Sequence, residues 1–148
     1  MKPLEGPRPW SVNLFAIAFV GLGLMALIQG LSDIEAQAIE YAGMLPRLAW
    51  DRDMTIVALS ARFTIVLIPV LAVWAFANTF ARLLVSLVAL LGLPGLVLQI
   101  HRMITHGIAA SDGLTPTIVM YGAIALLFTP SAAGWFRYKG ASEAATFE

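Results

Sequence analysis

The sequence contains no cysteine. This absence excludes disulfides, thiol redox chemistry and cysteine-ligated metal, although it does not identify the compartment. Charge is also scarce, because only 12% of the residues are charged, about half the share of an ordinary soluble domain. The formal net charge is +0, so we expect no basic surface for nucleic acid.

Motifs for catalysis are missing as well. The sequence has neither the Gly-x-Ser-x-Gly pattern of a nucleophilic serine nor a phosphate-binding P-loop. His101 and His106 stand five positions apart, which on a helix places them ~140° apart, so they cannot face one metal ion. The sequence therefore predicts no catalytic residue and no metal site, implies no cofactor, and argues against an enzyme.

Long apolar runs are what the sequence does contain. Its mean hydropathy is +0.84 and 59% of its residues are hydrophobic. Between Arg62 and Ile100 the only charge is Arg82, and an uncharged apolar run of about 18 residues or more is the signal for a membrane-spanning helix. We expect two such helices joined by a tight turn at residues 77–79, in an integral membrane protein whose 148 residues form a single transmembrane domain.

Four spans are expected, at about residues 10–31, 57–81, 83–104 and 116–136. The first uncharged run exceeds the ~7–15 apolar residues of a signal peptide, so we expect it to be retained. The predicted fold class is all-α: an integral membrane four-helix bundle with a short amphipathic surface helix between spans 1 and 2.

The short helix is expected from about Asp33 to Met44. Ser32-Asp33-Ile34-Glu35 has the capping-box pattern, in which serine and glutamate side chains bond the first backbone donors of a helix. An apolar stripe follows it, so the helix should lie at the membrane surface or continue the first span. It serves either as a spacer or as a docking element for a partner.

Small side chains recur along one side of the first and the fourth span. Lipid tails are as apolar as the helix side chains, so the hydrophobic effect does not drive helices together in a bilayer. Small residues instead let helix backbones approach closely and pack. The stripe predicts either packing against a neighbouring helix of the same chain or dimerisation. Its members are Ala16, Gly23, Ala26, Gly30, Gly122 and Ala125.

Prolines and glycines interrupt the second and third spans. Pro69 predicts a kink in the second span, since proline removes a helical hydrogen bond. Gly92, Pro94 and Gly95 make the middle of the third span the weakest helical point of the chain. Such a break gives a helix its shape or, in a transporter, forms part of a substrate site.

Arg62 is the one ionisable candidate within the spans. Its long side chain can extend to the headgroups at one end of the span. The functional alternative is a lipid-headgroup or anion contact, with Asp51, Asp53 or Glu40 as an ion-pair partner.

Basic residues predict the orientation, because those in short flanking segments stay cytoplasmic. With four spans, one side holds Arg47, Arg52 and Arg102, and the side of the two termini holds Lys2, Arg8, Arg82, Arg137 and Lys139. We therefore expect a bacterial inner-membrane protein with both termini in the cytoplasm.

Three functions fit this sequence. The first is a non-catalytic accessory or structural subunit of a larger membrane protein complex, such as a photosynthetic or respiratory energy-converting assembly. The alternative is a small oligomeric transporter or channel for a solute, an anion or a lipid. The third is a lipid- or quinone-handling enzyme. The expected partners are membrane lipids and either other membrane subunits or a second copy of the chain, and no nucleic acid.

Overall fold

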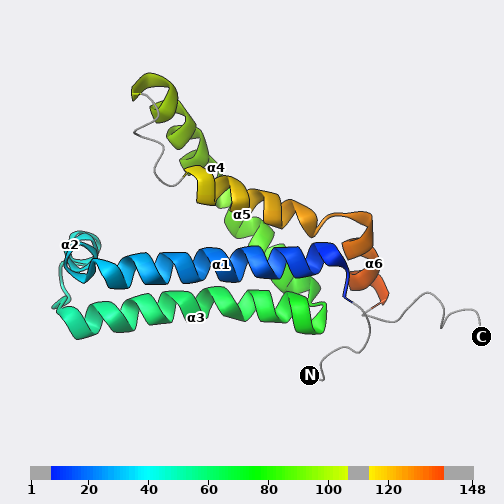
Figure 1. Cartoon of the computed structure of the whole chain (residues 1–148), viewed down its shortest axis with the longest axis horizontal. Helices are drawn as coiled ribbons and strands as arrows, with labels where there is room; N and C mark the ends of the chain where they lie inside the picture. Colours follow the sequence, from blue (N-terminus) through cyan, green and yellow to red (C-terminus); the bar gives the residue numbers. More distant parts are fainter. Residues whose placement is uncertain (1–7, 107–113, 139–148) are drawn as a thin grey trace, which may run out of the picture. The chain divides into compact units, whose positions relative to one another are not determined.

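The computed structural model describes residues 8–106 and 114–138, which form helices and no strand, so the all-α class is confirmed. Residues 1–7, 107–113 and 139–148 lie outside the described residues, and with them Lys2 and Lys139, on which the predicted orientation partly depends. Figure 1 labels the helices, which are α1 (Trp10–Ser32), α2 (Ile34–Met44), α3 (Arg52–Phe76), α4 (Thr79–His106), α5 (Leu114–Leu126) and α6 (Pro130–Tyr138).

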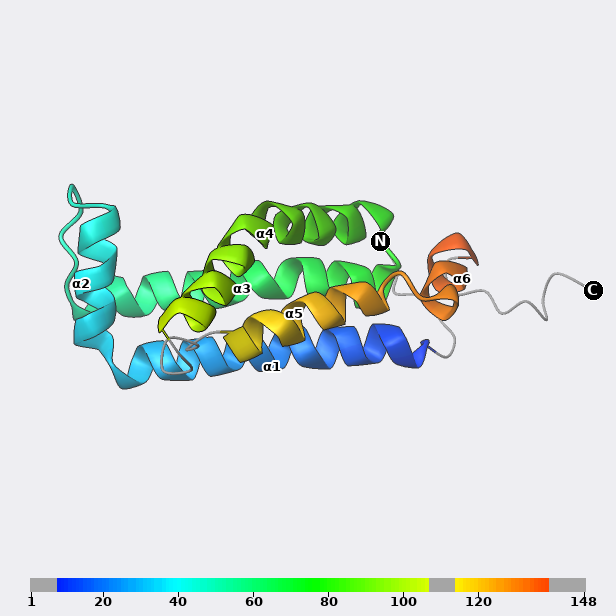
Figure 2. The same ribbon diagram turned by 90° about the horizontal axis from the view of Figure 1, so that it is seen from above.

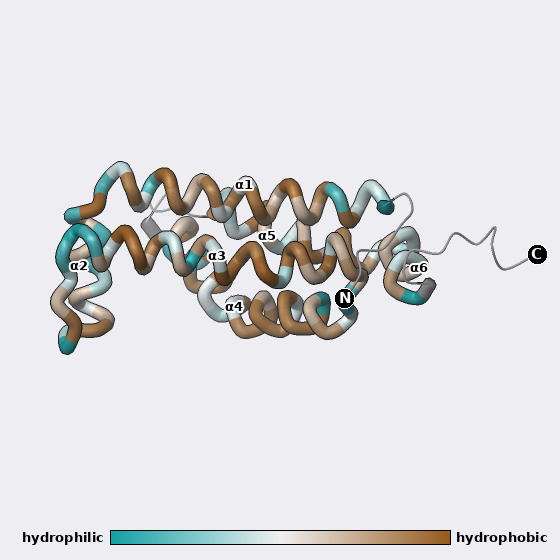
Figure 3. Tube along the Cα trace, turned by 90° about the horizontal axis from the view of Figure 1, so that it is seen from below, coloured by the Kyte–Doolittle hydropathy of each residue, from teal (hydrophilic) through white to brown (hydrophobic). Residues whose placement is uncertain are grey.

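Three of these helices are long and apolar enough to cross a membrane. They are α1, α3 and α4, with mean hydropathies of 2.2, 2.3 and 2.4 over their most apolar windows. In Figure 3 most of the length of these three helices has the brown of hydrophobic residues, whereas α2 has more teal, hydrophilic positions. These helices fit a membrane-embedded protein, as the sequence predicted.

The fourth predicted span, 116–136, is not one helix. It is divided into α5 and α6, which are bent by 56° relative to each other. A new helix begins here: the Thr129 carbonyl accepts from the Ala133 amide at 2.9 Å, and Pro130, which has no amide hydrogen to donate, takes the first position. A span is formed here only if the bent pair crosses as a unit.

The chain divides into two compact units. Unit 1 comprises residues 1–19 and 69–148, and unit 2 comprises residues 20–68. The division falls within α1 and, at Pro69, within α3. The helices α3 and α4 continue through Pro69 and Pro94, so neither proline ends its helix.

In unit 2, two glycines of the predicted stripe pack against α3. Gly30 is buried, and a Cβ built on it would lie 2.6 Å from Cδ2 of Leu59. A Cβ on Gly23 would lie 3.2 Å from Cδ2 of Phe63. These two positions therefore serve packing within the chain, whereas Ala26 of the same stripe is exposed.

The start of α2 differs from the predicted capping box. Asp33 is the capping residue, and its carboxylate accepts a hydrogen bond from the Ala36 amide at 3.2 Å. Ser32 is instead the last residue of α1, and its hydroxyl donates to the carbonyl of Ile28 at 2.8 Å. The expected extent of α2 is right to within a residue, and none of its residues is buried.

In unit 1, the predicted turn between the second and third spans is present. Ala77 has a φ of 43°, in the left-handed region, and reverses the chain after Phe76. Asn78 then caps α4, because its side-chain oxygen accepts from the amides of Phe80 at 2.9 Å and Ala81 at 3.2 Å. The second span consequently ends at Phe76 and not at residue 81.

The middle of α4 is where α5 attaches. Figure 2 shows the α4 ribbon bending about midway along its length, and Pro94 lies in this part of the helix and cannot donate to the carbonyl of Leu90. One residue earlier, the Ala89 carbonyl accepts a hydrogen bond of 2.8 Å from the Tyr121 hydroxyl of α5. Gly92 leaves room for it, since a Cβ there would lie 3.1 Å from that hydroxyl oxygen.

Candidate functional site

Arg62, the predicted lipid or anion contact, is exposed on α3. The carboxylates proposed as its partners have other contacts: Asp51 accepts from the Met54 amide at 2.8 Å, and Glu40 accepts from the Gln37 amide nitrogen at 3.2 Å. The structure thus does not bring the predicted charges together around Arg62, and both interpretations of this residue remain predictions.

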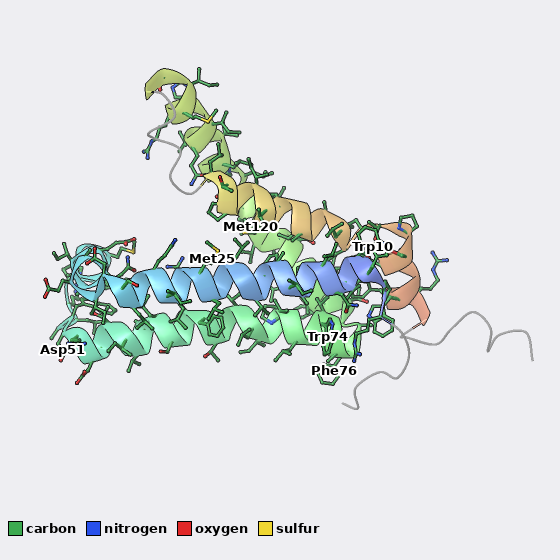
Figure 4. All side chains as sticks on the ribbon, in the orientation of Figure 1. Trp10, Met25, Asp51, Trp74, Phe76 and Met120 are labelled. Carbon is green, nitrogen blue, oxygen red and sulfur yellow. The ribbon has the colours of Figure 1, made fainter. Side chains whose placement is uncertain are left out.

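Unit 1 contains an arginine site that the sequence did not reveal. It lies at Trp74, which Figure 4 labels near the end of α3. The Arg8 guanidinium carbon lies 3.9 Å from the centre of the Trp74 ring, and its Nε donates to the Trp74 carbonyl at 3.1 Å. The Trp74 indole nitrogen in turn donates to the side-chain oxygen of Asn13 at 2.9 Å. We call these three residues the Arg8 cluster. It satisfies one of the last carbonyls of α3, which have no donor within the helix.

A second arginine of unit 1 lies between aromatic rings. The Arg82 guanidinium carbon is 4.3 Å from the centre of the Phe128 ring and 4.9 Å from that of Phe136. Its Nε is buried and has no hydrogen-bond partner among the described residues. Cation–π contacts of this kind contribute about 0.5–2 kcal/mol each.

Charges are distributed unevenly between the two units. The described residues of unit 1 include no Asp or Glu, although they include Arg8, Arg82, Arg102 and Arg137. The described carboxylates all belong to unit 2: Asp33, Glu35, Glu40, Asp51 and Asp53. Within the part of unit 1 that the structure describes, Arg82 consequently meets rings and no carboxylate.

Hydroxyl groups join α1 to the break between α5 and α6. The Ser11 hydroxyl is fully buried and lies 3.2 Å from that of Ser131, which lies 3.2 Å from that of Thr129. Nearby in sequence, the indole nitrogen of Trp135 is buried without a partner among the described residues. The first residues of α1 and α6 therefore lie side by side.

Gly122 and Ala125, the two residues of the predicted stripe on α5, are uncovered. A Cβ built on Gly122 would meet nothing described within 4 Å, and Ala125 is exposed. The same holds for Gly95 on α4. Unlike Gly23 and Gly30, these three positions are not used by packing among the described residues.

Metal-ligating side chains do not cluster in the described ranges, where no group of three His, Cys, Asp or Glu could hold an ion. Sequence reasoning missed the Arg8 cluster because Arg8 and Trp74 are 66 positions apart. No local pattern marks such a pair. In comparisons with protein-family models, curated proteins and solved structures, nothing matches the chain.

Proposed function

We propose that the protein is a non-catalytic accessory subunit of a larger membrane protein complex, for example an energy-converting one. The observation that carries this proposal is how little of each long helix the chain itself covers. Only 17% of the most apolar window of α1, 17% of that of α3 and 11% of that of α4 are buried. Such surfaces need lipid or other apolar helices around them.

The uncovered small residues favour protein over lipid on one of these surfaces. Helices approach each other closely where glycine and alanine interrupt larger side chains, and Gly122 and Ala125 on α5 are free for such an approach. Large side chains flank them, including Ile118, which is 58% exposed. We assign the partner contact to this face of α5.

The test is purification from native membranes in a mild detergent, with mass spectrometry of the eluate and its absorption spectrum. We expect partner subunits in fixed proportion, and we expect Gly122→Leu to lose them. Leu91→Phe is the matched control, because Leu91 is already large and is 72% exposed on α4. A protein that purifies alone and transports a solute in liposomes contradicts the proposal.

The alternative is a small oligomeric transporter or channel. The bent pair α5–α6 favours it, because transporters place substrates at broken helices, and buried Ser11 adds a polar group beside the break. A homo-oligomer without other subunits, together with solute flux that Ser131→Ala reduces, would support this function over the first.

We also propose that the protein lies in the bacterial inner membrane with both termini in the cytoplasm. The Ser11–Ser131 contact supports an even number of crossings, because it returns the chain to the side where α1 begins. A reporter that works only in the cytoplasm should be active when it is fused after Glu148. Activity of a periplasm-only reporter at the same position contradicts this topology.

A further inference from the structure

A pocket of about 550 Å³ lies beside α2 in unit 2. Its walls come from the end of α1, the first two turns of α2 and the start of α3, with Trp50 from the connection between α2 and α3. We call it the α2 pocket. The pocket lies at the ends of α1 and α3, which are long and apolar enough to cross a membrane, and the ends of such helices meet the headgroup layer.

Charges of both signs line the α2 pocket. Asp33 and Glu35 contribute carboxylates, and Arg52 contributes a guanidinium. The hydrogen bond from the Ala36 amide fixes the Asp33 side chain as the cap of α2. Two negative charges and one positive charge disfavour a purely anionic ligand. A ligand with both an anionic and a cationic group can pair its anion with the guanidinium and its cation with the carboxylates.

Apart from Ser32, the remaining lining is apolar and includes exposed side chains. Leu31, Ile34, Ala38 and Ile39 line the pocket. Ile39 is 75% exposed and Leu31 is 40% exposed. A ligand that uses the whole pocket is therefore amphiphilic, with its charged group beside Arg52 and its apolar part along these side chains.

Trp50 gives the pocket a rigid wall. Its indole nitrogen donates to the carbonyl of Leu45 at 3.0 Å, and its ring lies 4.9 Å from that of Tyr41 on α2. Tryptophan is enriched at the level of lipid headgroups, where one side of the ring is apolar and the other is wet. The wall thus fits a lipid ligand.

We propose that the α2 pocket binds the headgroup of a phospholipid that carries a phosphoethanolamine, with the phosphate at Arg52 and the ammonium at Asp33 and Glu35. Arginine matches the planar geometry of phosphate oxygens. A primary ammonium donates hydrogen bonds to both carboxylates, which a quaternary choline cannot do. This site does not depend on the role as a subunit proposed above.

The test is native mass spectrometry of the purified full-length chain in detergent. Phosphatidylethanolamine, phosphatidylcholine and phosphatidylglycerol with identical acyl chains are titrated separately, and soluble phosphoethanolamine is added as a competitor. We expect phosphatidylethanolamine to bind about tenfold more tightly than the other two lipids. Equal binding of the three lipids overturns the headgroup assignment. If soluble phosphoethanolamine binds as tightly as phosphatidylethanolamine, the proposal that the ligand is a lipid is overturned.

Variants locate the binding. Arg52→Gln and Glu35→Gln should each weaken phosphatidylethanolamine binding about tenfold. The matched controls are Arg47→Gln and Glu40→Gln, which remove the same charges from residues that do not line the pocket. Both controls should bind as the unchanged chain does. Unchanged binding by the two pocket variants, or an equal loss in the controls, overturns the site.

Discussion

The Tyr121 hydroxyl of α5 donates a 2.8 Å hydrogen bond to the Ala89 carbonyl of α4. This bond lies beside Leu90, whose carbonyl has lost its helical donor because residue 94 is proline. The bend of α4 and the attachment of α5 are thus one feature, and Gly92 provides the space for it.

Tyr121→Phe removes this hydrogen bond and keeps the ring. We expect a loss of about 0.6–2 kcal/mol in the free energy of unfolding, the range for hydrogen bonds between membrane helices. Unfolding by SDS in detergent micelles, followed by circular dichroism, measures it. Tyr41→Phe is the control, because its ring contact with Trp50 needs no hydroxyl. Equal stability of the two variants would show that the Ala89 bond contributes nothing.

Gly30→Ala should destabilise unit 2. The new Cβ would lie 2.6 Å from Cδ2 of Leu59, which is only 3% exposed, so overpacking should cost about 1–3 kcal/mol. The same unfolding measurement applies. Gly21→Ala, at a position within α1 where a Cβ meets nothing described within 4 Å, should not destabilise and should gain about 0.5–1 kcal/mol from helix propensity.

A second substitution separates a steric clash from a change in helix propensity. In the Leu59→Ala background, Gly30→Ala should lose most of its effect, since residues in contact are non-additive. An unchanged cost in that background would refute the contact between Gly30 and Leu59.

Arg8→Gln should lower the free energy of unfolding by about 1 kcal/mol, because it removes a cation–π contact and a hydrogen bond to α3. In the Trp74→Leu background the same change should cost less, which a double-mutant cycle measures. Arg47→Gln, in the exposed connection after α2, is the control. Strict additivity of Arg8→Gln and Trp74→Leu would argue against the pairing.

Arg62→Lys should keep membrane insertion and assembly if the side chain only extends its charge to the headgroups. Arg62→Lys and Arg62→Gln are compared by the amount of protein in the membrane fraction and by its elution volume. We expect lysine to behave as arginine and glutamine to lower the yield. A loss with lysine as large as that with glutamine would indicate a bidentate arginine contact.

Local signals in the sequence explain which parts of the fold could be predicted. Continuous apolar runs predict α1, α3 and α4. The turn at residues 77–79 follows from the boundary between the second and third of these runs. Thr129 and Pro130 also carry a helix-start signal, but proline at this place has two interpretations, a kink or a new helix. Only the backbone geometry decides between them.

Tertiary contacts explain what could not be predicted. The sequence identified Gly23 and Gly30 as packing positions, but not Phe63 and Leu59 as their neighbours. The sequence indicates for Arg82 only a charge that sets orientation, because the rings that contact it, Phe128 and Phe136, are far from it in the sequence. Cation–π geometry depends on the fold and leaves no periodic mark in the sequence.

Only Ala77 and Asn78 separate α3 from α4. Two residues extend by at most about 7 Å, far less than a bilayer's hydrocarbon thickness of about 30 Å. A connection this short cannot cross the hydrocarbon layer, so α4 would begin at the same membrane face at which α3 ends. As membrane spans, α3 and α4 would therefore run in opposite directions, and reversing one of them would reverse the other.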